Sequence, residues 1–146
     1  MKSDSVEMVI QLEDKVEIER LISILNIGLC VAIARGALSV EEAENYLYSP
    51  YTMQKLKTLG VSQALIDTIH LGTELENVER LVPESFSDSL NEIQEKAIEI
   101  LRSLPPTALP RDKWVQSIAA NGQTDLETNG KPNLMHSTEV YAMTRK

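Results

Sequence analysis

The stretch from about Glu13 to Arg35 constrains the fold more than any other part of the chain. Its apolar residues recur at intervals of three and four, the spacing of one face of an α-helix, and further apolar residues form a second face. A helix that is apolar on most sides is usually buried on most sides. The sequence therefore predicts a long central helix, the most buried element of the fold, with Leu25 as a core residue. The first face holds Ile18, Leu21, Ile22, Leu25, Leu29, Ala32 and Ile33, and the second holds Ile24, Ile27 and Val31.

Shorter helices are predicted to follow, because each has a local sequence signal for a helix start or a helix end. Serine begins several of them as an N-cap, and Ser39 with Glu42 has the spacing of a capping box. A second capping box is predicted at 73–76. Glycines are expected to end the preceding helices, at Gly36, Gly60 and Gly72. The predicted helices span residues 39–48, 50–58, 62–71, 74–81 and 86–104.

The two ends of the chain differ from this helical middle. Residues 8–12 are compatible with a short strand or with the lead-in to the first helix. Prolines begin at Pro105, and residues 121–139 have the composition of a linker. Within this region, 114–119 has the apolar spacing of a short helix. We therefore expect an all-α fold in which residues 1–104 form a compact multi-helix domain around a central buried helix, and 105–146 form an irregular, weakly structured C-terminal extension.

Composition narrows the class of protein. The chain has 146 residues, 42% of them hydrophobic, which is enough for one domain with its own core. The single cysteine, Cys30, excludes an internal disulfide and suits a reducing compartment. The N-terminus lacks the pattern of a signal peptide, and the longest apolar stretch is shorter than a membrane span. These features predict a cytoplasmic protein without a membrane contact.

The charge of the chain bears on its partners. The net charge is −8, and residues 1–104 hold 18 acidic and 9 basic side chains, whereas residues 105–146 hold 4 and 5. Nucleic acids are bound largely by cations that displace counterions from phosphate. The three short helices from 39 to 71 suggest a DNA-binding helix-turn-helix motif. The third helix, however, has no lysine or arginine to contact bases in a DNA groove. We therefore expect no nucleic acid as a partner and favour a basic protein.

Three short segments carry a resemblance to a known family. They are Glu19-Arg20-Leu21-Ile22-Ser23-Ile24-Leu25, Ser49-Pro50-Tyr51-Thr52 and Ile69-His70-Leu71-Gly72-Thr73-Glu74-Leu75. From about residue 18 to 104, the chain resembles a family of short, uncharacterised bacterial proteins that is known only as a domain of unknown function. The resemblance implies a bacterial helical domain, leaves out the segment after Pro105, and supplies no catalytic residue.

The sequence offers little for catalysis or metal binding. Cys30 lies among apolar residues and is interpreted as an inert packing residue. Asp67, His70 and Glu74 have the spacing of metal ligands on one helical face, but Gly72 is expected to break that face, so His70 is interpreted as a residue of the last helical turn. Motifs of nucleophilic catalysis and phosphate binding are missing. We assign no catalytic residue, metal site or cofactor.

Partner binding is the remaining interpretation. Residues 74–99 are densely acidic and have only two basic residues. Three of the four tyrosines lie close together at 46–51, and tyrosine is enriched at binding hot spots. Packing against the core explains the clustered tyrosines as well, and solubility explains the acidic residues as well. The candidate partner-binding residues are Tyr51, Glu76, Glu79, Glu92, Glu95 and Glu99.

Three classes of function follow from these observations. We favour a non-catalytic protein-binding module, of the immunity or antitoxin type, that masks a basic protein. The alternatives are a small metal- or carboxylate-dependent enzyme and a nucleic-acid-associated regulator. An apolar helix such as 13–35 is also compatible with burial in a homo-oligomer, so both a monomer and an oligomer remain open.

Overall fold

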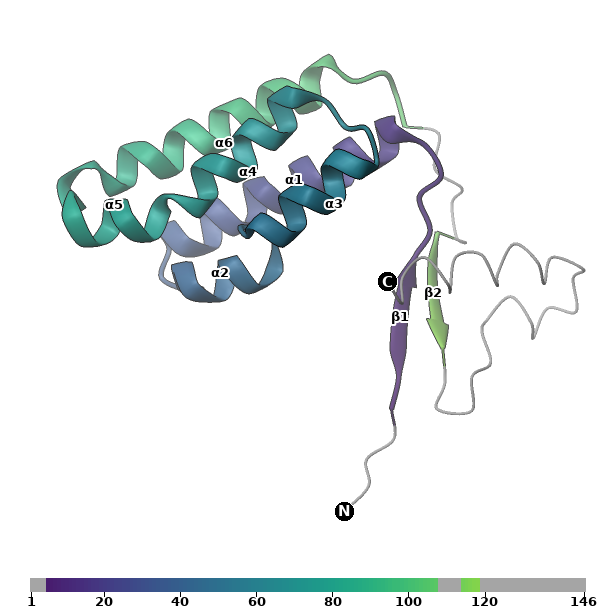
Figure 1. The fold of residues 1–146 in the computed structure, drawn as a ribbon, viewed down its shortest axis with the longest axis horizontal. Helices are drawn as coiled ribbons and strands as arrows, with labels where there is room; N and C mark the ends of the chain where they lie inside the picture. Colours follow the sequence, from purple (N-terminus) through teal and green to yellow (C-terminus); the bar gives the residue numbers. More distant parts are fainter. Residues whose placement is uncertain (1–4, 108–113, 119–146) are drawn as a thin grey trace, which may run out of the picture. The chain divides into compact units, whose positions relative to one another are not determined.

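The computed structural model describes residues 5–107 and 114–118 (Figure 1). The chain divides into two compact units, of which Asp14–Thr107 is helical. The second unit contains two short strands. The described fold is thus all-α apart from one small sheet, which confirms the predicted class. The elements are β1 (Glu7–Ile10), α1 (Lys15–Ala34), α2 (Val40–Tyr46), α3 (Pro50–Thr58), α4 (Gln63–Thr73), α5 (Leu75–Leu81), the 3-10 turn η1 (Pro83–Ser85), α6 (Phe86–Ser103) and β2 (Val115–Ile118).

Serine caps begin three of the helices as predicted. The Ser39 hydroxyl accepts the backbone N–H of Glu42, whose carboxylate accepts the backbone N–H of Ser39, so the capping box is complete. Ser49 caps α3 by accepting the backbone N–H of Thr52, and Ser62 caps α4 by accepting that of Leu65. Each cap satisfies an amide that the first turn of a helix leaves without a partner. These local signals therefore fix the starts of α2, α3 and α4.

The junction between α4 and α5 differs from the prediction. Gly72 is predicted to end the helix, but α4 continues through it to Thr73, and α5 starts without a side-chain cap. A Cβ atom added to Gly72 would lie 2.2 Å from Cδ1 of Tyr48. Gly72 is therefore required by the tyrosine ring packed against α4, and the helix does not need to end there.

The helices pack in an order that follows from Figure 1 and from their contacts. α1 lies along α6 and also contacts α2 and α4, while α3 packs on α4 and α5 packs on α6. Apolar side chains from all six helices meet between them. The buried apolar residues of this core include Cys30, Ile33, Val40, Ala43, Leu47, Tyr48, Leu56, Ile66, Ile69, Leu75, Leu90 and Ile93.

α1 is central in its contacts, and part of its predicted first face lies in or against the core, namely Ile18, Ile22, Leu29 and Ile33. Most of its fully buried side chains are small and polar, and Ser23, Asn26 and Cys30 are all 0% exposed. Leu25, expected in the core, is 47% exposed. The prediction for Leu25 is therefore wrong. Residues 23, 26 and 30 share the helical face that meets α2 and α4, and this turns Leu25 outward.

The second unit contains β1 and β2 paired antiparallel, with Glu7 opposite Ile118 and Ile10 opposite Val115. Of the two readings left open for residues 8–12, the structure shows the strand, which spans Glu7–Ile10. The short helix expected at 114–119 is wrong, because Val115–Ile118 forms the strand β2. Its backbone groups pair with β1, and this pairing outweighs a helical spacing supported by only a few residues. The rest of the predicted extension, residues 108–113 and 119–146, lies outside the described residues.

Candidate functional site

The acidic residues predicted to bind a partner on α6 lie on one exposed face of that helix. Glu92, Glu95 and Glu99 are separated by three and four residues, which places them in one row along the helix, and all three are exposed. Glu92 and Lys96 are four residues apart on α6, but they form no ion pair in the part of the chain described here. The row is therefore held in place by the helix backbone and not by neighbouring cations.

Glu76 and Glu79 lie on α5 and are exposed. Glu76 is close to α2, where Glu44 is partly buried. That burial, followed by repulsion from Glu76 and Glu41, raises the pKa of Glu44. The acidic region thus consists of two parts. One is the row on α6, and the other is a cluster on α5 and α2 that repels negative charge.

Tyr51 lies on α3, and the structure does not place it in the acidic row. Its side chain is 63% exposed, with Nζ of Lys55 5.3 Å from the ring centroid. Both α3 and α6 pack on α4, and Figure 1 shows α4 between them. A partner that touches both Tyr51 and the row on α6 must therefore extend across α4.

A groove lies between α4 and α6 beside the acidic row. Its volume is about 360 Å³, and it carries carboxylates on both walls, Asp67 on α4 and Glu99 on α6. Lys96 also lines it, and Asp67 accepts a hydrogen bond of 2.9 Å from Nε2 of Gln63. The groove is open, and the carboxylates on its two walls are acceptors for the end of a long cationic side chain. The remaining lining residues are Ala64, Thr68, Ile100 and Ser103.

A buried hydrogen-bond network fixes the helices beneath this groove. The Tyr48 hydroxyl donates to Oδ1 of Asn26, and Nδ2 of Asn26 donates to Oγ1 of Thr68 at 3.1 Å. Cys30 Sγ lies 3.4 Å from the same hydroxyl, and burial raises the pKa of the thiol. A thiol that stays protonated is a poor nucleophile, so this arrangement supports packing and not catalysis.

The histidine considered as a metal ligand lies at the surface. Nε2 of His70 is 4.0 Å from Oε2 of Glu74, and both side chains are at least half exposed. Since α4 continues through Gly72, the helical spacing of His70 and Glu74 is real, but Asp67 is turned to Gln63 and the groove. Within residues 5–107 and 114–118, no three side chains are grouped as ligands for a metal ion.

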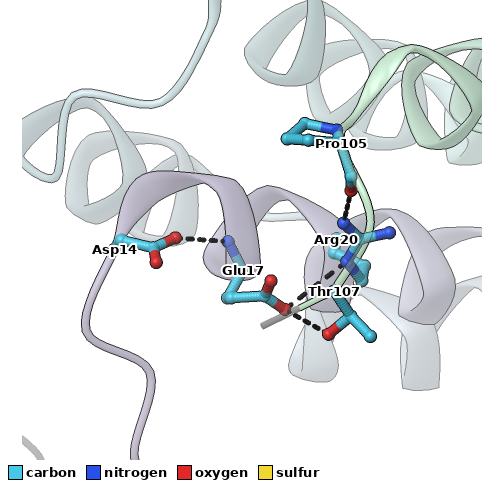
Figure 2. A network of polar contacts seen from close by, with 5 residues as sticks. All are labelled: Asp14, Glu17, Arg20, Pro105 and Thr107. Carbon is cyan, nitrogen blue, oxygen red and sulfur yellow. Dashed lines mark hydrogen bonds and ion pairs between the residues drawn. The ribbon is translucent and has the colours of Figure 1, made fainter. Parts of the chain in front are cut away.

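A polar cluster joins the start of α1 to the segment after α6 (Figure 2). Nε of Arg20 is 3.4 Å from Oε1 of Glu17, and Arg20 also donates to the carbonyl oxygen of Pro105. The Thr107 hydroxyl donates to the same Glu17 oxygen at 3.1 Å. We call this cluster of Asp14, Glu17, Arg20, Pro105 and Thr107 the α1–α6 clasp. It fixes the ends of the two longest helices and offers no open site.

The outer face of α1 is a feature that the sequence interpretation missed. Ile24, Leu25 and Val31 are 49%, 47% and 40% exposed, and Gly28 lies exposed between them. Ser23, Asn26 and Cys30 share one face of the helix in the sequence, but polar residues on a helix usually face water, so this pattern did not identify the buried side. We call Ile24, Leu25, Gly28, Val31 and Ala32 the outer α1 face.

Comparison with known proteins gives one result. Residues 13–116 match the model of a protein family described as "Protein of unknown function (DUF3969)". The match begins before the resemblance noted at 18–104 and continues beyond Pro105, so it includes the α1–α6 clasp. No curated protein and no solved structure matches the chain significantly. None of the helices in the described part of the chain is long and apolar enough to cross a membrane.

Proposed function

Because the chain belongs to DUF3969, a family described only as having unknown function, we propose its function from its surface: it is a non-catalytic module that binds a basic protein. The observation that carries this proposal is the groove between α4 and α6, which opens beside the acidic row. Asp67 and Glu99 stand on its two walls, and Glu95 and Glu92 continue along α6.

The geometry suits an arginine or lysine of a partner protein. A cationic side chain that enters the groove meets carboxylates from two helices, and charge-assisted hydrogen bonds are stronger than neutral ones. The exposed carboxylates of the row attract a basic protein before contact, and this attraction accelerates association. Salt at physiological concentration screens the attraction only beyond about 8–10 Å. Lys96 also lines the groove and offsets part of the negative charge of the two carboxylates.

We also propose a biological role and a cellular compartment for this module. A small acidic protein that covers the basic surface of a toxin or enzyme is of the immunity or antitoxin type, and we propose this role in a bacterial cytoplasm. The net charge of −8 and a single buried cysteine support it. In this role the row on α6 speeds association, and contacts that reach Tyr51 slow dissociation.

The test uses charge reversal with a matched control. Glu92, Glu95 and Glu99 are changed together to lysine, and the control variant carries lysine at Glu41, Glu74 and Glu84, which gives the same change in net charge at other exposed positions. The partner is captured from the native cell with the unmodified protein, and its association rate is measured at several salt concentrations. We expect the first variant to slow association and to flatten its salt dependence.

The control is expected to reduce the association rate much less. Equal effects of the two variants would show that only net charge matters, and an unchanged rate for the first variant would remove the acidic row from the interface. A companion variant, Tyr51→Ala, is expected to speed dissociation without changing the salt dependence of association, because an aromatic anchor acts mainly after encounter.

A further inference from the structure

The groove between α4 and α6 presents hydrogen-bond acceptors on both of its walls. Glu99 and Ser103 lie one helical turn apart on α6, and Asp67 lines the groove from α4. The bond from Gln63 uses only one carboxylate oxygen of Asp67, so the other oxygen remains an acceptor. The Ser103 hydroxyl donates its hydrogen to the carbonyl oxygen of Ile100 at 2.7 Å, which leaves the hydroxyl oxygen to accept. These groups therefore suit a ligand that is rich in donors.

The charges of the groove define the charge of that ligand. Asp67, Glu99 and Lys96 line it, so it holds one more negative charge than positive charges. Lys96 forms an ion pair with neither carboxylate within the described ranges of the chain. The two carboxylates thus lack a counter-charge close to them, and a ligand with a single positive charge balances the groove.

The remaining lining gives an incoming charge little to replace its water. Ala64 and Ile100 contribute apolar surface. The hydroxyl of Thr68 is 1% exposed and already bonded inside the protein, because it donates to the carbonyl oxygen of Leu65 and accepts from Nδ2 of Asn26. A cation that enters the groove therefore exchanges part of its hydration for contact with apolar atoms.

Arginine and lysine differ in how they meet such a lining. The ammonium group of lysine is a compact, strongly hydrated charge with three donors, whereas the guanidinium group of arginine is planar, more weakly hydrated and has five. The edge of the plane can donate to carboxylates on two walls, and its faces need no hydrogen bonds and tolerate apolar contact. The groove volume of about 360 Å³ is also much larger than a single ammonium group requires.

We propose that the groove between α4 and α6 binds the guanidinium group of an arginine in preference to the ammonium group of a lysine. This inference rests on the proposed function, and it adds which side chain of the basic protein enters the groove. Asp67 and Glu99 receive the two sides of the guanidinium group, and the exposed row on α6 attracts the rest of the basic surface.

The experiment uses two probes that differ only in the cationic group, N-acetyl-arginine methylamide and N-acetyl-lysine methylamide. Each is added to the full chain labelled with ¹⁵N, at constant ionic strength and up to about 100 mM, because single side chains bind weakly. We expect the amide signals of α4 and α6 around the groove to shift. The dissociation constant should be about three- to tenfold lower for the arginine probe, the usual net contribution of one further hydrogen bond.

Two variants keep the size of the groove side chains and remove one charge each. Asp67→Asn and Glu99→Gln should weaken both probes and abolish the preference for arginine, since the guanidinium group loses one of its two carboxylates. The matched control is Glu84→Gln, which removes the same charge at an exposed position of η1 outside the groove and should keep the preference.

Three results would overturn the inference: equal affinities for the two probes, shifts that leave out the groove, or a preference that persists in Asp67→Asn and Glu99→Gln. Equal affinities would leave the proposed function standing, because a lysine-rich protein is also a basic partner. Conversely, an association rate that does not respond to charge reversal of the row on α6 would contradict the proposed function, and the arginine preference of the groove would be measured independently of it.

Discussion

Gly72 lies in the middle of a helical turn, directly against the ring of Tyr48. A Cβ atom at this position would be 2.2 Å from Cδ1 of a ring that is itself only 1% exposed, so neither group has space to move. We expect Gly72→Ala to lower the free energy of unfolding by about 1–3 kcal/mol, the usual cost of overpacking a core. Urea unfolding followed by circular dichroism measures this change.

The same substitution at Gly28 is the matched control. Gly28 also lies inside a helix, but its side is open. Alanine there should raise the stability of dilute protein by about 0.4–1 kcal/mol, because it restricts the unfolded chain and favours the helix. A gain of similar size at both glycines would mean that helix propensity, and not the contact with Tyr48, determines the result at Gly72.

Cys30 and Tyr48 make the stability of the protein depend on alkaline pH. Burial raises the pKa of the Cys30 thiol above its ordinary value of 9.0, and burial likewise raises the pKa of Tyr48 above 10.0. The folded protein therefore keeps both protons at a pH where the unfolded chain loses them. Stability is complete below about pH 9 and falls as the pH rises, by up to about 1.4 kcal/mol per pH unit for each group.

Urea unfolding at a series of pH values between about 7 and 10.5 tests this expectation. Cys30→Ser keeps a hydrogen-bonding group beside Tyr48 but does not titrate in this range, so its stability should fall less steeply between about pH 9 and 10. Identical slopes for the two proteins would exclude Cys30 as a source of the pH dependence.

At the scale of the elements, α1 shows where sequence periodicity reaches its limit. Apolar residues cover most of the helix, so periodicity alone does not identify the buried side. The buried side is set by Asn26, which donates to Thr68 on α4 and accepts from Tyr48 after α2. Those partners are 42 and 22 residues away along the chain. The existence of the helix could therefore be predicted from sequence, but its orientation depended on distant contacts.

This orientation gives a prediction about two apolar residues. Leu25 is 47% exposed on α1, whereas Ile93 is 1% exposed on α6. Ile93→Ala should lower the free energy of unfolding by about 2–5 kcal/mol, because it leaves a cavity in the core. In dilute protein, Leu25→Ala should cost less than about 1 kcal/mol, since water already reaches much of its surface. Chemical unfolding of the two variants side by side measures the difference, and a larger loss at Leu25 would place the outer α1 face in the core.

The helix starts and the candidate site differ in how far local signals could predict them. Ser39, Ser49 and Ser62 act within one helical turn, so the starts of α2, α3 and α4 were readable directly. The exposed row on α6 was also readable, because charged residues opposite an apolar stripe face water. The groove was not, since Asp67 and Glu99 come from helices that only tertiary packing brings together. The short segment Val115–Ile118 was misread as a helix for the same reason, because its strand partner is more than 100 residues away.

At the scale of the whole molecule, the helical unit Asp14–Thr107 contains the entire buried core of the helices. The sequence placed the end of this body at residue 104, where α6 stops. The structure adds the next three residues, because Pro105 and Thr107 complete the α1–α6 clasp (Figure 2). A change in composition marks the end of a helix, but it does not show which residues beyond that helix are still bound to the core.

The α1–α6 clasp predicts which C-terminal truncation of the helical unit keeps its full stability. A fragment of residues 14–107 should fold as a helical unit with a cooperative thermal transition. A fragment of residues 14–104 removes the acceptor of Arg20 at Pro105 and the hydroxyl of Thr107 that donates to Glu17. Since Glu17 is only 5% exposed, the lost bonds are not fully replaced by water, and we expect the shorter fragment to be less stable by about 1–3 kcal/mol. Thr107→Ala in the longer fragment loses one of the two contacts and should fall between them. Chemical unfolding of the three fragments gives the order, and equal stability of 14–104 and 14–107 would show that the clasp contributes nothing to the fold.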